Sequence, residues 1–213
     1  MGIFSRLLGK NKEKAAMAAI FEKLRLILED EQLQLEMVPP AIRSKIISGG
    51  DYDQNPQGTG QFGFSRTNAI PVNGPVGQLA YLSKLITNSN ERILFHRLGA
   101  ISDIDVFEAV TFSGSEWFLF FLDLYHPRRS KLAPQGLRFN GQVAQFSGFN
   151  NFCEQFPYDF VQAKANCPRD LRLAYIPISS IDRQLRSGVF VRPSSHKAKL
   201  EVIEGHLTST RGQ

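Results

Sequence analysis

The sequence lacks any apolar run that approaches the roughly 18 residues needed for a membrane-spanning helix. Its start shows no signal peptide with a small-residue cleavage site, and Arg6 stands where a myristoylation signal requires serine or threonine. It has only two cysteines, Cys153 and Cys167, and their separation matches no metal-binding or redox motif. We therefore predict a cytoplasmic protein with reduced thiols, with a disulfide as the alternative in an oxidising compartment.

The common catalytic motifs are also missing. No Gly-Lys-Ser or Gly-Lys-Thr sequence marks a phosphate-binding loop, and no Gly-x-Ser-x-Gly elbow marks a hydrolase nucleophile. The histidines, at positions 96, 126, 196 and 206, show no His-x-x-x-His spacing that would place two metal ligands on one helix face. The sequence predicts neither a metal site nor a bound cofactor.

The formal net charge is +5, and the whole excess lies near the end of the chain. Residues 1–163 hold 16 Lys and Arg against 16 Asp and Glu, whereas residues 164–213 hold 9 against 4. A basic end attracts acidic partners or nucleic acid, or it is a solvated surface. Proteins that bind single strands interleave exposed aromatic residues with their cations. Here the aromatic residues cluster in apolar runs, and Phe190 alone lies near the basic tail, which argues against nucleic acid.

The first quarter of the chain has helical periodicity. From Ala15 to Val38, apolar residues recur at spacings of three and four and form one broad stripe: Ile20, Leu24, Ile27, Leu28, Leu35 and Val38. Pro39-Pro40 ends this helix, and a second one is expected over residues 41–48. Residues 49–63 contain five glycines and are typical of a linker or long loop. We therefore predict a helical arm over residues 1–48 and a boundary at 49–63.

Residues 64–192 are expected to form the main domain. A helix is predicted over residues 73–87, followed by strands over 92–98, 105–112 and 117–125, the last two joined by a hairpin at 113–115. A helix followed by consecutive strands favours an α+β domain in which an antiparallel sheet packs with helices. Residues 193–213 have few apolar residues, so we expect a basic and partly flexible tail.

The strand over 117–125 ends in a cluster of cations, which is the strongest candidate for a binding site. His126, Arg128, Arg129 and Lys131 follow the strand, and Asn73 and Gly74 lie at an expected helix start with free backbone amides. Together these groups would bind a phosphate or carboxylate. The structural alternative is that Arg128 and Arg129 pair with nearby acids, namely Asp103, Asp105 or Glu108, and hold the turn.

An acid–base site is the second candidate, built from Asp123, His126, His96 and Glu108. Asp123 interrupts an apolar strand, so a buried carboxylate there would need a partner and would have a shifted pKa. Residues three apart on a strand point to opposite faces, however, so a direct pair between Asp123 and His126 requires the chain to bend immediately.

The N-terminus offers a third candidate surface. Ile3, Phe4, Leu7 and Leu8 form an apolar face beside basic residues. Such a segment makes weak contact with an anionic membrane surface, docks onto a partner, or packs on its own domain. The sequence leaves these three alternatives open.

Three blocks resemble a family of uncharacterised bacterial proteins: Ile70–Gly77 (IPVNGPVG), Phe95–Gly99 (FHRLG) and Asp123–Ser130 (DLYHPRRS). The resemblance covers part of the main domain and neither the arm nor the tail. It implies a bacterial, cytoplasmic origin, and it carries no activity, cofactor or catalytic residue to this chain.

The sequence favours a non-enzymatic binding or interaction protein. Its arm, residues 15–48, would engage a protein partner or a second copy, and the turn at His126, Arg128 and Arg129 would recognise a small anionic ligand. The alternative is a small hydrolase or transferase that uses Asp123 and His126 on a phosphorylated or carboxylated substrate.

Overall fold

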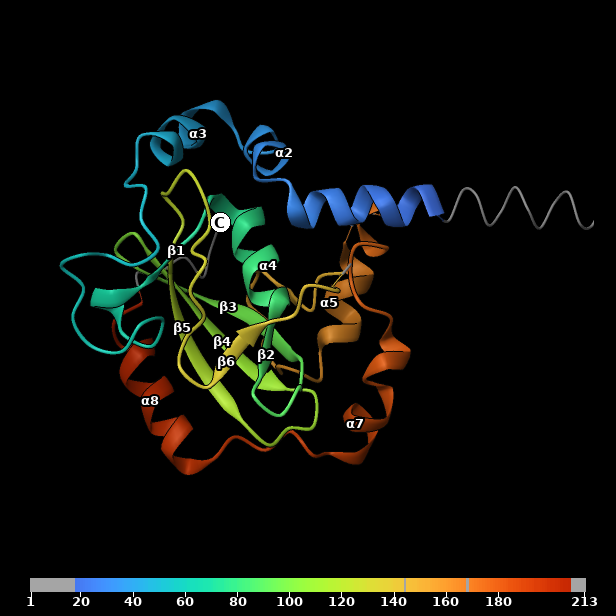
Figure 1. Ribbon diagram of the computed structural model, residues 1–213. Coiled ribbons are helices and arrows are strands. Elements are labelled where there is room, and N and C mark those ends of the chain that lie inside the picture. The colour runs from blue at the N-terminus through green and yellow to red at the C-terminus, as the bar shows by residue number, and fades with distance from the viewer. Residues whose placement is uncertain (1–17, 144, 168, 208–213) are drawn as a thin grey trace, which may run out of the picture.

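A central sheet with helices on both faces forms the body of the protein (Figure 1). The structure is a computed structural model that describes residues 18–143, 145–167 and 169–207. The sheet has the order β1-β5-β4-β3-β7, with bounds Ile70–Pro71 (β1), Trp117–Asp123 (β5), Ile104–Thr111 (β4), Ile93–Ile101 (β3) and Gly148–Phe149 (β7). This arrangement confirms the α+β class.

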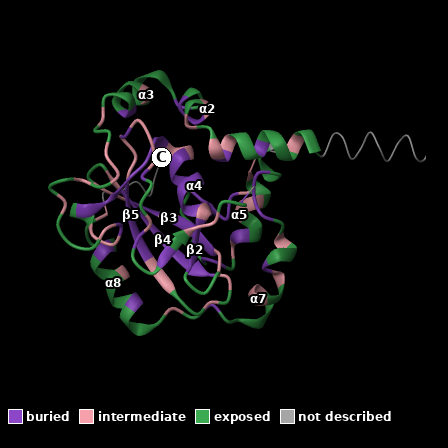
Figure 2. Ribbon diagram, in the orientation of Figure 1, coloured by how far each residue is buried: buried purple, intermediate pink, exposed green. Residues whose placement is uncertain are grey.

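The three long strands form an antiparallel meander, as predicted. Most of their residues are buried, and these include phenylalanine, valine and isoleucine on both faces of the sheet (Figure 2). The turn from β4 to β5 includes Gly114, whose φ of +80° suits a residue without a Cβ atom. The short strands β1 and β7 pair parallel with β5 and β3, so the complete sheet is mixed.

The helix predicted over residues 73–87 is shorter in the structure: α4 spans Gly74–Lys84 and packs against β3 and β7. It continues into β2 (Leu85–Thr87), which pairs with β6 (Leu137–Phe139) in a small second sheet. The remaining short elements lie around this body, and their bounds are Arg66–Asn68 (η1), Phe160–Asn166 (α5), Arg169–Arg172 (α6), Ile178–Ser180 (η2) and Asp182–Ser187 (α7).

The predicted single helix over 15–38 is wrong, because the chain breaks at Asp30. Residues 18–29 are helical, α2 spans Glu31–Glu36, and α3 spans Pro40–Ile47. The Asp30 carboxylate accepts hydrogen bonds from the backbone amides of Gln32 and Leu33, at 2.9 and 3.0 Å. An aspartate that caps a new helix in this way competes with continuation of the preceding one.

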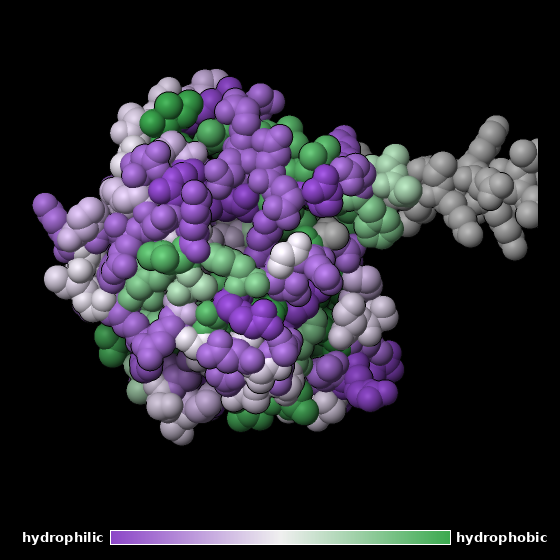
Figure 3. All heavy atoms as spheres, viewed as in Figure 1, coloured by the Kyte–Doolittle hydropathy of each residue, from purple (hydrophilic) through white to green (hydrophobic). Residues whose placement is uncertain are grey.

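The apolar stripe of the arm is buried against the domain. Leu24 and Leu28 belong to the main core, while Leu35, Val38 and Ile46 form a separate cluster with Leu124 and Tyr125. Apolar side chains also reach the surface over α3, where Ile42 and Ile47 are exposed (Figure 3). The side chains expected to recruit a partner are thus largely used within the molecule. The N-terminal face at Ile3, Phe4, Leu7 and Leu8 lies outside the described residues.

The expected flexible tail is instead a helix over most of its length. Helix α8 (Ser194–Glu204) covers the face of the sheet opposite α4. Its inward positions are His196, Leu200 and Ile203, followed by Leu207, at spacings of four, three and four residues. Few apolar residues are sufficient because this spacing gathers them onto one side. Residues 208–213 lie outside the described part.

The arm offers a matched pair of neighbours to test its docking. Ile46 is 0% exposed, whereas Ile47 is 58% exposed. We expect Ile46→Ala to lower the free energy of unfolding by about 2–4 kcal/mol, because it leaves a cavity, and Ile47→Ala by less than about 0.5 kcal/mol. Denaturant unfolding of both variants measures this, and equal effects would contradict the docked arm.

Candidate functional site

The arginine turn binds the protein's own carboxylates. Arg128 donates through Nε to Asp51 and through Nη1 to Asp53, each at 2.5 Å. The amide of Lys131 also donates to Asp53, at 2.8 Å. These hydrogen bonds hold the loop over residues 49–53 against the turn that follows β5.

Arg129 holds the arm instead of the loop. It contacts Glu31 through Nε at 3.1 Å and donates to the backbone carbonyls of Leu28 and Glu29 at 2.8 and 3.0 Å. These carbonyls lie at the end of the helix over 18–29, where orphan acceptors and the helix dipole favour a cation. The predicted partners Asp103, Asp105 and Glu108 were wrong. The acids that pair with these arginines come from the arm and the 49–53 loop.

The helix start at Asn73 and Gly74 is also occupied. The Asn73 side chain donates to Gln34 of α2 at 2.9 Å, and the Gly74 amide donates to the carbonyl of Leu124 at 2.9 Å. A cavity of about 340 Å³ lies beside the arginine turn, lined by Lys84, Arg128, Arg129 and Lys131 among others. Lys84 pairs with Glu29 at 2.5 Å, so an anion entering this cavity competes with carboxylates already in place.

Asp123 and His126 do form a pair, with 3.2 Å between Oδ2 and Nε2. The required bend exists because β5 ends at Asp123, whose Oδ1 accepts the amide of Tyr125 at 3.0 Å. The other ring nitrogen, Nδ1, lies 2.6 Å from the carbonyl of Gly50. A carbonyl oxygen only accepts, so Nδ1 carries a proton. Nε2 faces a carboxylate, and the geometry therefore favours the imidazolium form.

The two pKa values shift in opposite directions. Burial lowers the pKa of His126, but the hydrogen bonds to Asp123 and Gly50 outweigh it, and the net pKa is raised. Burial raises the pKa of Asp123, but bonds from His126 and the Tyr125 amide bring it below its usual value. The adjoining cavity holds only about 40 Å³, enough for roughly one water molecule.

Glu108 is the buried centre of a second cluster, on the middle strand β4. Arg192 binds both carboxylate oxygens, at 2.6 and 2.8 Å, and Nε2 of His196 lies 2.9 Å from Oε1. His96 Nε2 lies 3.0 Å from Oε2, while its Nδ1 accepts the amide of Cys153. Burial opposes ionisation of Glu108, but the hydrogen bonds from Arg192, His196 and His96 outweigh it, and its pKa is held far below the usual range.

Neither His96 nor Cys153 in this cluster is available as an acid, base or nucleophile. His96 uses both ring nitrogens, and burial lowers its pKa, so it is held neutral. Burial raises the pKa of Cys153 to about 12, which keeps that thiol protonated and unreactive. Both cysteines are free thiols in the structure. Sequence reasoning named His96 and Glu108 but missed Arg192 and His196, which lie four residues apart on either side of the predicted start of the tail at 193.

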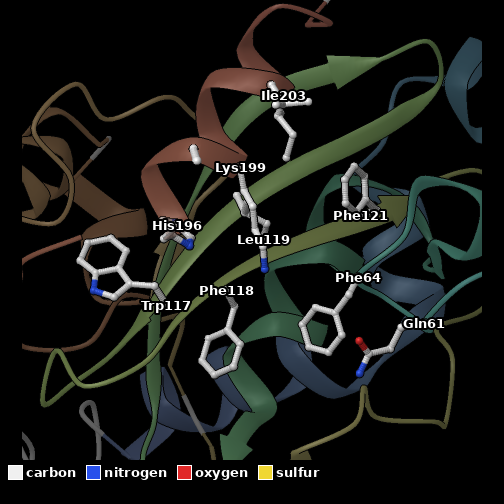
Figure 4. Close-up of a pocket in the computed structure, with 11 residues that line it drawn as sticks. Gln61, Phe64, Trp117, Phe118, Leu119, Phe121, His196, Lys199 and Ile203 are labelled. Carbon is white, nitrogen blue, oxygen red and sulfur yellow. The ribbon is translucent and has the colours of Figure 1, made fainter. Parts of the chain in front are cut away.

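An apolar groove of about 670 Å³ lies between β5, α8 and residues 61–64 (Figure 4). It is larger than the cavities beside Arg129 and His126 and the one of about 290 Å³ beside Glu108. Its apolar lining includes Phe64, Trp117, Phe118, Leu119, Val202 and Ile203. The side chain of Lys199 extends from α8 toward β5. No aspartate or glutamate belongs to the described residues that line it.

Sequence reasoning missed this groove. The apolar run of β5 was visible, but α8, which forms the opposite wall, was assigned to a flexible tail.

Comparison with known proteins found no family model, no curated protein and no solved structure that matches this chain. Within the described residues, no helix has the length and apolar character needed to cross a membrane.

The buried Glu108 cluster predicts a large effect of one substitution. In Glu108→Gln the charge that Arg192 and the histidines face is lost, and we expect the free energy of unfolding to fall by about 3 kcal/mol. The exposed Glu116→Gln is the control, with an expected change within about 0.5 kcal/mol. Denaturant unfolding at neutral pH measures both, and a Glu108→Gln variant as stable as this control would refute the anchoring role.

The Asp123–His126 pair predicts a pH dependence of stability. A raised folded pKa means that His126 contributes most below the unfolded value of about 6.5, and that this contribution is lost as pH rises through the folded pKa. The difference in unfolding free energy between the unmodified protein and His126→Gln should therefore shrink from pH 6 to pH 9. The exposed His206→Gln serves as control. If the difference between the unmodified protein and His126→Gln grows with pH, the pKa of His126 is not raised on folding.

Proposed function

We propose that this protein is a non-enzymatic binding protein and that the groove between β5 and α8 receives part of a partner protein. The observation that carries the proposal is the groove itself, whose described lining combines open apolar surface with one lysine and no carboxylate. Its size falls within the usual range of ligand sites, roughly 300–1,000 Å³. Exposed apolar surface of this kind marks interaction sites.

The enzymatic alternative has weaker support. Asp123 and His126 converge, but the cavity beside them has room for about one water molecule rather than a substrate. The Glu108 cluster is saturated by Arg192 and two histidines. Recognition of a small anion by Arg128 and Arg129 has less support than groove binding, because both guanidinium groups already face carboxylates.

The proposed compartment is the cytoplasm, where free thiols such as Cys153 and Cys167 persist. The groove, rather than the arm over 15–48, is the surface that we propose for partner binding. The arm buries Leu24, Leu28, Leu35, Val38 and Ile46 against its own domain.

Trp117 lines the groove and is the single tryptophan of the chain, so its fluorescence reports occupancy directly. We use anilinonaphthalene sulfonate as an apolar, anionic probe and expect saturable quenching of Trp117 emission. Val202→Asp places a charge in the groove and should weaken the binding about tenfold. Val191→Asp is the matched control, because the two valines are 64% and 66% exposed and Val191 does not line the groove.

Two results would count against groove binding. One is the absence of saturable quenching in the unmodified protein. The other is probe affinity that is equally reduced in both aspartate variants, which would point to a general effect on the fold.

A further inference from the structure

The backbone of β5 turns some of its polar groups away from the sheet. In an antiparallel pair, alternate residues exchange hydrogen bonds with the partner strand and the residues between them face outward. The amide of Phe121 donates outward to the carbonyl of Gly63 at 2.9 Å, and the carbonyl of Asp123 accepts outward from Val72 at 2.8 Å. By the same alternation, Trp117 and Leu119 also direct their N–H and C=O groups away from β4.

These outward groups lie beyond the reach of the neighbouring strand. Strand β1 pairs only with Leu122 and Asp123 of β5, and the contact with Gly63 ends at Phe121. Among the described residues, no hydrogen bond to the outward groups of Trp117 or Leu119 is found. At about 3.3 Å per residue, the open edge from Trp117 to Leu119 is roughly 7 Å long. An open edge of this kind is a template for an added strand.

The groove surrounds this open edge with side chains from both faces of the sheet. Phe118 and Phe64 lie on the side of the main core, and Leu119 lies on the side of α8 with Ile203. A strand added to the edge would place alternate side chains against these two walls. Because α8 flanks one side and residues 61–64 the other, a single extended segment fits the edge better than a second complete sheet (Figure 4).

The charge of the lining identifies the partner further. Lys199 extends toward the open edge, no described acid lines the groove, and no ion pair to Lys199 is found among the described residues. An apolar segment that carries a carboxylate at one position complements this surface.

We propose that β5 binds an extended segment of a partner protein as an additional strand, with apolar side chains in the groove and a carboxylate facing Lys199. This inference rests on the groove being the binding surface proposed above. It adds the mode of binding, which is backbone pairing with Trp117 and Leu119, and the chemistry of the partner segment.

The test begins with selection of linear heptapeptides from a random display library on the full chain, followed by synthesis of the enriched peptide. Amide hydrogen exchange is then measured with and without this peptide. The amides of Trp117 and Leu119 should slow by at least about tenfold, since pairing protects them. The amides of Phe118 and Phe120 face β4 already and should change little.

Two sets of variants separate strand pairing from apolar contact alone. Methylation of the peptide's backbone nitrogens should abolish binding at every second position and be tolerated between them, following the two-residue period of a strand. Lys199→Glu should weaken binding of an acidic peptide by at least about two- to fivefold. Lys197→Glu is the control on the same helix, because Lys197 lines the cavity beside Glu108 instead.

Three outcomes would overturn the inference. Enrichment of no peptide, or unprotected amides at Trp117 and Leu119 while the fluorescent probe still binds, would leave groove binding intact and remove strand addition. Protection that rises with protein concentration without peptide would assign the edge to a second copy. If the unmodified protein binds neither the fluorescent probe nor any peptide, the proposed function itself is refuted.

Discussion

The buried carboxylate of Glu108 is the constraint around which the sheet and the last part of the chain are organised. An ion in the middle of a sheet costs several kcal/mol in lost hydration unless donors replace the water. Only one of those donors, His96, lies on a neighbouring strand; Arg192 and His196 come from the segment that begins α8. The carboxylate therefore requires α8 to start over this face. Once it starts there, Ile203 and Leu207 cover Leu98 and Val106.

The same anchoring creates the groove. Helix α8 passes beside β5 without pairing with it, because a helix has no strand edge to offer. Helix α8 forms one wall of the groove and is held at its start by the ion pair of Arg192 with Glu108, about three turns from the end of the helix. Residues 61–64 form the other wall and are held by the hydrogen bond between Gly63 and Phe121. The outward groups of Trp117 and Leu119 lie between these walls. The groove therefore combines apolar side chains with outward-facing backbone groups of β5, between two walls that the rest of the fold holds in place.

At the opposite end of the molecule, cations serve the arm in a comparable way. Arg129 reaches the carbonyls at the end of the helix over 18–29, and Arg128 binds the two aspartates of the following loop. The charges of Arg128 and Arg129 are thus neutralised by carboxylates of the same chain. Arg128 and Arg129, which first suggest a ligand site, therefore hold segments of the chain together. The surface proposed for binding instead consists mainly of apolar side chains and backbone groups of β5.

Much of the fold follows from the sequence because it depends on local patterns. The alternation and apolar density of β3, β4 and β5, the turn at Gly114 and the start of α4 at Gly74 all reflect the preferences of neighbouring residues. The break at Asp30 was one local feature missed, because an aspartate in a helical pattern is equally compatible with a solvated residue and with a helix cap. The identity of the partners of Arg128, Arg129 and Glu108 could not be read in this way. Apart from the pair of Glu108 with His96, which are 12 positions apart, these pairs join residues 75–101 positions apart, and only packing brings them together. The sequence by itself determined the strands, the main helix and the location of the charged turn. The tertiary structure decided that the turn is internally paired, that the tail is a helix and that an open edge of β5 lies in a groove, because each depends on which distant segments share a surface.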